Sequence, residues 1–491
     1  MKAAAMKAAA PAMLLMLALC GCALGPPRRS APALLEARAV GLLGPPAPPV
    51  TDRWWEDYHD PQLNALVERA SWRNPTLAEA LARLERAQAE ARAAAGTLSP
   101  QLNASAGVLR ERYSARYVIP PPYGGATVWD GQLSLGLSWD LDFWGRQRDL
   151  VHAGDARVQA AALDARAAQL ALQGALVTTY LEYDRSQALA DLGSQFQANR
   201  ARLADLTARR VTAGLDANAE LQNASAPVPE ARLELKKSLA RVEMLRHQLA
   251  ALSGQGAEAY AAIGPPALDG AASPALPEDL PADLLLRRPD IQAALARVHA
   301  ADSGAEAARL ARYPDIQLTA FAGTAGIGLG DLLSAPARTL GVGPKLLLPV
   351  FDAGVLRARY QAAGAALNAA VAAYDEAVLN AVRETADQIG LLHALAAEHR
   401  DAEQQLAHLS AAYRLVAQRR QAGLTGEQAV LEAESRLLTA RASLVTTRAL
   451  EDESRVALLV ALGGGVPVPG SGSASGSAPG PTAPSARVPP L

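Results

Sequence analysis

The feature that most constrains this chain is an internal duplication whose landmarks recur at matched spacings. Two prolines stand 25 residues apart in each copy, and two glycines stand 69 residues apart in each copy. These markers are Pro75, Pro100, Gly145 and Gly214 in the first copy and Pro289, Pro314, Gly354 and Gly423 in the second. Only the stretch between the second proline and the first glycine differs, 45 residues against 40, where a loop tolerates an insertion. Chance similarity between alanine-rich helices would not reproduce two intervals, so we interpret the chain as two copies of one unit.

In that stretch the sequence alternates between apolar and polar residues. Every second residue from Leu133 to Phe143 is large and apolar, and the residues between them are Ser, Gly or Asp. This period of two predicts a strand, which at about 3.3 Å per residue is long enough to cross a bilayer obliquely. The turn-rich segment 120–125 joins it to an earlier arm, so we predict a hairpin over 101–143 and a second over 315–352. A soluble hairpin with one buried face is the alternative.

Two hairpins supply only four strands per chain. Lipid cannot satisfy the hydrogen bonds of an open sheet edge, so a sheet that spans a membrane must close on itself. The smallest single-chain barrels have about eight strands. If the hairpins lie in a membrane, several subunits must therefore share one barrel.

Helical periodicity follows each hairpin. The segments 146–213 and 355–422 contain no proline, and each predicts an uninterrupted helix of about 100 Å. Beyond them, apolar residues recur every seven positions, which predicts return helices over 215–253 and 424–462 that pack as coiled coils. The second return segment carries two such rows one residue apart, so we expect neighbours on both of its sides, as a ring of helices requires. An ordinary alanine-rich bundle is the alternative.

The two copies extend over 54–262 and 288–462, and a proline-rich connector over 263–287 joins them. The final segment, 463–491, is rich in Gly, Pro and Ser and predicts a disordered tail. Half of the residues are hydrophobic but only 4% are aromatic, which is typical of helices that pack along alanine and leucine seams. The net charge of −2 argues against a nucleic-acid partner.

The first 21 residues predict a secretory signal peptide, because lysines precede an apolar run that is too short to span a membrane. The signal ends in Leu19-Cys20-Gly21-Cys22, which is similar to the processing site of bacterial lipoproteins. Cys22 is then the expected first mature residue and lipid carrier, at the head of a linker over 22–53. A plain secretory signal with an incidental cysteine is the alternative.

No catalytic or metal-binding pattern stands out in the sequence. The seven histidines are scattered, none lies in an HExxH spacing, and the mature chain offers no second cysteine for a zinc site. Glycines at 323, 326, 328 and 330 lack the spacing of a phosphate-binding loop. We therefore expect no enzyme activity, no cofactor and no metal.

Several stretches together resemble outer-membrane efflux lipoproteins of the TolC/NodT type, over roughly residues 54 to 462. These stretches are Trp54-Trp55 with Asp60-Pro61, Asn74-Pro75, Phe143-Trp144-Gly145, LLLRRPDI from Leu284 to Ile291, and LPVFDAG from Leu348 to Gly354. The resemblance implies a fold that is mainly α with a membrane β-barrel. It implies a TolC-like homotrimer with a shared 12-stranded barrel, four strands per chain, and a long α-helical periplasmic tunnel.

The resemblance also implies a function and partners. The trimer would be the outer-membrane channel of a tripartite efflux system, a passive exit duct for drugs, metals or other small molecules. An inner-membrane pump and a periplasmic adaptor would deliver the cargo, and Cys22 would anchor the chain to outer-membrane lipid with a large periplasmic part. A type I secretion exit duct and a non-conducting structural lipoprotein that spans the periplasm are the alternatives.

The family places the helix reversals at the periplasmic tip of the tunnel. The residues that match its tip and gate are Arg210, Gly214, Glu220, Arg419, Gly423 and Glu432, and those that match its adaptor contacts are Leu215 and Leu424. Three Glu432 side chains in a trimer would repel one another and select cations. Solvated helix charges are the alternative. Pro227 and Pro229 interrupt a return helix that the family usually leaves regular.

Overall fold

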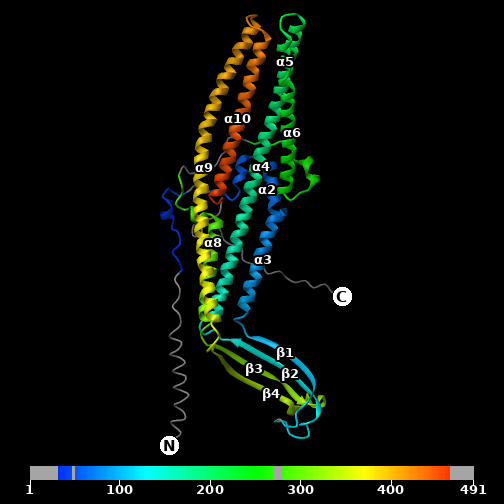
Figure 1. The fold of residues 1–491 in the computed structure, drawn as a ribbon, viewed down its shortest axis with the longest axis vertical. Helices are drawn as coiled ribbons and strands as arrows, with labels where there is room; N and C mark the ends of the chain where they lie inside the picture. The colour runs from blue at the N-terminus through cyan, green and yellow to red at the C-terminus, as the bar shows by residue number, and fades with distance from the viewer. Residues whose placement is uncertain (1–30, 47–49, 117, 269–278, 465–491) are drawn as a thin grey trace.

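The computed structural model of the chain describes residues 31–46, 50–116, 118–268 and 279–464. The signal peptide, Cys22 and the tail beyond Gly464 lie outside the described residues. The described chain is strongly elongated, with a sheet at one end and two helical hairpin tips at the other (Figure 1). The length follows from the long proline-free segments, each of which forms one helix of 67 residues.

The sheet consists of four antiparallel strands in the order β1-β2-β3-β4. Their bounds are Gln101–Arg112 for β1, Thr127–Asp140 for β2, Asp315–Ile327 for β3 and Arg338–Leu347 for β4. The two hairpins come from the two copies and join through β2 and β3, where Leu135 stands opposite Ala322. Within the described chain, the outer edges of β1 and β4 have no partner strand.

Apolar side chains on this sheet face outward without cover. Leu133 and Leu135 are 44% and 45% exposed, and Leu340 and Val342 on β4 are 83% and 78% exposed. A soluble sandwich would bury one face of the sheet, but none of the residues of β1 is buried. The structure therefore does not favour the soluble hairpin that the alternation alone left open.

The helices repeat with equal lengths. The short helices α3 (Pro75–Gly96) and α8 (Pro289–Leu310) have 22 residues each. The long helices α4 (Arg146–Thr212) and α9 (Val355–Gln421) have 67 residues each. Gly145 and Gly354 precede α4 and α9 with the same left-handed φ of 88°, which glycine adopts without a Cβ clash. None of the helices in the described part of the chain is both long and apolar enough to span a membrane.

The return helices differ from the sequence expectation. In place of one helix over 215–253, the structure has α5 (Asn218–Ser225) and α6 (Pro227–Leu252). Pro227 has no N–H to donate to the preceding turn and is best placed at the start of a helix, so it begins α6. In the second copy α10 is unbroken over Glu427–Ala461, three residues later than predicted because the tip turn occupies the intervening residues.

Smaller elements form a belt around the middle of the molecule. They are η1 (Ala37–Val40), η2 (Trp54–Tyr58), α2 (Pro61–Arg73), η3 (Ala257–Ala262) and α7 (Leu284–Arg287), while η4 (Leu329–Asp331) and η5 (Ala335–Ala337) lie in the β3–β4 loop. Two buried clusters lie at this level. One gathers around Trp54, Tyr180 and Leu245, and the other around Leu284 and Ile291. Full burial of such a side chain contributes about 1.5–3 kcal/mol, so the belt holds the otherwise thin helical layers together.

Each short helix lies end to end with a return helix, and both pack against the same long helix (Figure 1). The pair α3 and α6 packs against α4, and the pair α8 and α10 packs against α9. The junctions are equivalent in the two copies. Asn74 Nδ2 donates to the carbonyl of Leu252 at 2.9 Å, and Arg288 Nη1 donates to the carbonyl of Ala461 at 3.0 Å. Each bond satisfies a carbonyl at a helix end that would lack an intrahelical partner. The duplication seen in the sequence thus extends to the contacts that join the helices.

Candidate functional site: the helical tips and the N-terminal segment

The first tip reverses the chain between α4 and α5. Gly214 has a φ of 72°, and the backbone N–H of Leu215 donates to the carbonyl of Arg210 at 2.9 Å. This is the hydrogen-bonding of a helix that ends on a left-handed glycine. The Arg210 guanidinium binds Asp216 through two hydrogen bonds of 2.6 and 2.9 Å. The hydrogen bond from Arg210 lowers the pKa of the Asp216 carboxyl, so the pair is ionised at neutral pH.

The second tip repeats this backbone between α9 and α10. Gly423 has a φ of 76°, and the N–H of Leu424 donates to the carbonyl of Arg419 at 2.8 Å. Thr425 stands where the first tip has Asp216. Within the described residues, Arg419 has no ion pair.

The leucines proposed to contact an adaptor point away from the protein. Leu215 and Leu424 are each 69% exposed, at equivalent positions one residue after the glycine. Both tips lie at the end of the molecule opposite the sheet (Figure 1). Two exposed leucines at the end of the elongated molecule form an apolar contact point that no described residue of the chain covers.

The two carboxylates predicted at the gate are exposed and lie on different hairpins. Glu220 lies in the first turn of α5. Glu432 lies on α10 and accepts a hydrogen bond from Gln428 Nε2 at 3.0 Å. One chain does not bring them together, so a carboxylate ring can form only between chains.

The sequence did not predict a set of hydrogen bonds that joins α4 to α10 near the tips. Asn199 of α4 donates from Nδ2 to the carbonyl of Leu431 at 3.0 Å and to Glu434 at 2.8 Å, and Arg202 reaches the same carboxylate at 3.3 Å. In the sequence, Asn199 is a polar residue between the apolar Phe196 and Leu203. Its partners lie more than 230 positions away, so no local spacing could have indicated them.

A second polar contact missed by the sequence analysis joins α9 to α10 at mid-height. His399 Nδ1 lies 2.6 Å from a Glu451 oxygen, and Arg455 donates to Glu451 at 2.7 Å. Burial of Glu451 favours its neutral form, but the hydrogen bonds from Arg455 and His399 outweigh burial and lower its pKa. Burial dominates at the neighbouring Asp452 and raises its pKa.

The N-terminal segment lies against α9 and the belt. The backbone N–H of Leu35 donates to Asp375 at 3.1 Å, Leu34 packs at the edge of the second core cluster, and Leu42 is buried within that cluster. Leu35 follows Cys22 by 13 positions, an extended reach of about 45 Å. The rise of α9 from Val355 to Asp375 is about 30 Å. The distance along α9 from Asp375 to the sheet end is therefore shorter than the extended length of 13 residues.

Within the described residues, no group of three or more His, Cys, Asp and Glu side chains is arranged to hold a metal ion. The chemistry that the tips offer is electrostatic: paired and unpaired arginines, exposed carboxylates and exposed leucines around two helix reversals. Together with a sheet that has two open edges, this arrangement defines one protomer of a membrane channel with a helical extension.

Comparison with known proteins gives the family. The model of the outer membrane efflux protein family matches residues 66–255 and 280–464, and the chain belongs to this family. It is 36% identical over 315 residues to the fusaric acid resistance protein FusA of Burkholderia cepacia, a match that covers 64% of this chain and 59% of that protein. It is 31% identical over 352 residues to the multidrug resistance outer membrane protein MdtQ of Escherichia coli O157:H7, covering 70% of this chain and 73% of that protein.

Solved structures agree with the fold. The outer membrane protein VceC of Vibrio cholerae superposes with a TM-score of 0.77 at 31% identity, covering 85% of this chain and 99% of VceC. The outer-membrane channel OprN superposes with a TM-score of 0.77 at 28% identity, covering 90% of this chain and 99% of OprN. The TolC-like fold class and the assignment to outer-membrane efflux channels are thereby confirmed. Channels of this family are trimeric and work with adaptor proteins and inner-membrane pumps.

Proposed function

We propose that this chain forms a homotrimeric, passive exit duct in the outer membrane, without a catalytic step of its own, for small molecules such as drugs or metals. The observation that carries the proposal is the four-stranded sheet with open edges on β1 and β4, continuous with two helical hairpins built on helices of about 100 Å. Three chains that pair β1 with β4 would satisfy every edge in one 12-stranded barrel. The relatives named for fusaric acid and multidrug resistance support efflux as the purpose.

The tips are the proposed periplasmic end of the duct. Residues of both tips would form the gate, namely Arg210, Gly214, Glu220, Arg419, Gly423 and Glu432. A periplasmic adaptor linked to an inner-membrane pump would contact Leu215 and Leu424, whose exposure is otherwise unexplained. In the proposed assembly the pump and adaptor would select the cargo.

Lipid on Cys22 is the proposed anchor in the outer membrane. The length of the N-terminal spacer supports this anchor. The segment between Cys22 and Leu35, when extended, is longer than the distance along α9 from Asp375 to the sheet end. An anchor at this point would hold the N-terminal segment along α9 and leave the tips in the periplasm. The segment therefore connects the membrane surface to the buried belt.

Purified protein in planar bilayers tests the duct directly. We expect stepwise ion conductance from a trimeric preparation and increased drug susceptibility when the gene is deleted. Protein that stays monomeric, or that is absent from the outer-membrane fraction, would contradict the duct. A trimer without conductance would favour a non-conducting spacer, although a spacer has no need of strands with exposed apolar rows. Loss of protein export without loss of drug resistance on deletion would favour a secretion duct.

A further inference from the structure

The two tips share one backbone but differ in charge pairing. Arg210 and Arg419 are equivalent, each four residues before the tip glycine. Asp216 holds Arg210 in a bidentate ion pair. The second tip has Thr425 at that position, and a hydroxyl cannot replace a carboxylate in a bidentate contact with a guanidinium. The same turn is thus self-neutralised in one copy and left positive in the other.

The residues around the second tip extend this difference. The stretch 404–426 contains three arginines and no Asp or Glu. These arginines are Arg414, Arg419 and Arg420, all exposed, and none has an ion pair in the described chain. In the equivalent stretch of the first copy, Asp205 binds Arg209 as Asp216 binds Arg210. Within the described residues, the arginines near the tip of α9 therefore have no ion pair, whereas Arg209 and Arg210 near the tip of α4 do.

Two carboxylates on the other arm of the second hairpin have partners within the chain, whereas Glu427 in the first turn of α10 is exposed and has no ion pair in the described residues. Glu432 accepts from Gln428, and Glu434 is held by Asn199 and Arg202 of α4. Leu424 stands beside the unpaired arginines and is 69% exposed. With three unpaired arginines against one exposed, unpaired glutamate, the second tip presents an exposed leucine within a net positive surface.

We propose that the second-copy tip, through Arg419, Arg420 and Leu424, is the principal docking surface for a carboxylate-bearing hairpin end of the periplasmic adaptor. The first tip contributes apolar contact through Leu215 but little charge. This inference rests on the proposed function, because it names the chemistry that the adaptor must present. Breaking the Arg210–Asp216 pair would cost its charge-assisted hydrogen bonds, whereas Arg419 can bind an incoming carboxylate without losing a partner.

Charge of this kind acts mainly on the rate and selectivity of association. A cluster of unpaired arginines attracts an acidic partner over about 8–10 Å at physiological salt. Charges at the rim of an interface raise the association rate, and this enhancement becomes smaller as the salt concentration increases. Adaptor binding should therefore depend on ionic strength through the second tip and only weakly through the first.

The test gives Arg419 the carboxylate partner that Arg210 has in the first tip. Thr425→Asp places a carboxylate where Asp216 stands in the first tip, and Thr425→Asn is the matched uncharged control. Affinity of the detergent-purified trimer for the purified periplasmic adaptor of the same cell is measured at low and high salt. We expect Thr425→Asp to weaken binding about tenfold at low salt, which corresponds to about 1.4 kcal/mol, and to flatten the salt dependence. Thr425→Asn should bind like the unmodified protein.

The reciprocal change gives a second, independent readout. Asp216→Thr frees Arg210, so we expect the same or tighter adaptor binding and a steeper salt dependence. Equal adaptor affinity in all three variants and the unmodified protein would overturn the inference but leave the duct intact. Failure of the unmodified trimer to bind the adaptor would instead overturn the proposed function. A Thr425→Asp variant that changes trimer dissociation but not adaptor affinity would show that Arg419 contacts a neighbouring subunit of the trimer. That result would overturn the inference.

Discussion

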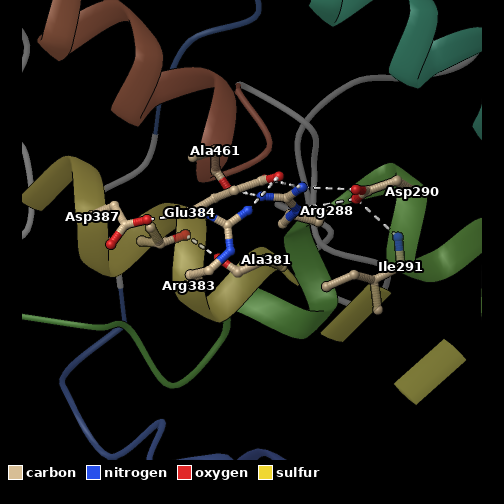
Figure 2. Close-up of polar contacts among 9 residues, drawn as sticks. Arg288, Asp290, Ile291, Ala381, Arg383, Glu384, Asp387 and Ala461 are labelled. Atoms are coloured by element: carbon tan, nitrogen blue, oxygen red, sulfur yellow. Dashed lines mark hydrogen bonds and ion pairs between the residues drawn. The ribbon is translucent and has the colours of Figure 1, made fainter. Parts of the chain in front are cut away.

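Arg288 donates a hydrogen bond to the carbonyl of Ala461 and so joins the start of α8 to the end of α10 (Figure 2). The same guanidinium binds Asp290 at 2.7 Å and Glu384 of α9 at 3.0 Å. One largely buried side chain therefore connects three helices at the level of the belt. Asn74 makes the equivalent single bond to Leu252 in the first copy, but without a link to the long helix.

Removal of this side chain should destabilise the second copy. We expect Arg288→Ala to lower the free energy of unfolding by about 1.5–3 kcal/mol, because it removes charge-assisted hydrogen bonds to the half-exposed Asp290 and Glu384 and leaves the Ala461 carbonyl without its partner. Arg83→Ala is the matched control, since Arg83 forms an exposed pair with Glu79 and such pairs contribute about 0–1 kcal/mol. Urea unfolding of the detergent-purified protein measures both. Equal effects of the two substitutions would remove Arg288 from its structural role.

Adjacent residues on α10 should respond in opposite directions to loss of charge. The pKa of Glu451 is lowered, so its ionised form stabilises the fold above the unfolded pKa of about 4.3. This contribution is lost as pH falls through the lower folded value. The pKa of Asp452 is raised by burial, so its ionised form destabilises the fold at neutral pH.

Thermal unfolding of two conservative variants measures this contrast. At pH 7 we expect Glu451→Gln to lower Tm and Asp452→Asn to raise it, each by a few degrees. At pH 3 both differences should shrink, because the native carboxyls become increasingly protonated. Shifts of the same sign at pH 7 would show that packing, rather than charge, dominates this site.

Glu432 should control ions at the tip if the three copies face the duct. We expect Glu432→Ala to raise single-channel conductance and reduce cation selectivity, because it removes three negative charges from a constriction. Gln428→Ala is the control, since it removes the hydrogen bond to Glu432 but keeps the charge. Bilayer recordings in symmetric and asymmetric salt measure both properties. An unchanged Glu432→Ala channel would place that carboxylate on a solvated helix face.

Cys22 should be required for firm attachment to the membrane. We expect Cys22→Ser to abolish metabolic acyl labelling, because the lipid is attached through this thiol. Each buried CH₂ of the acyl chain contributes about 0.8 kcal/mol to membrane binding. The variant protein that has not yet inserted its barrel should therefore be removed more easily when outer-membrane vesicles are washed. Cys20→Ser is the control, since Cys20 would leave with the signal peptide. Labelling that persists without Cys22 would exclude this anchor.

Local patterns predicted much of the architecture. Strand alternation around Leu135, the proline-free stretches of α4 and α9, and the glycines at both tips are features of neighbouring residues, and the structure places strands, helices and reversals at them. The helix predicted over 215–253 was wrong in its continuity, since the backbone restriction at Pro227 divides it into α5 and α6. The difference between Asp216 and Thr425 is visible in the aligned copies, but only the structure shows that Asp216 binds Arg210.

The sequence by itself determined the duplication, the four strands, the long helices and the need for partner chains, because periodicity, proline and glycine act over a few residues. Only the tertiary structure decided which distant groups meet. Asn199 with Glu434, Arg288 with Ala461 and His399 with Glu451 are pairs between helices, fixed by how the layers pack rather than by any spacing along the chain. It also decided which tip arginine is neutralised, since a charge has a partner only where side-chain geometry brings one within reach.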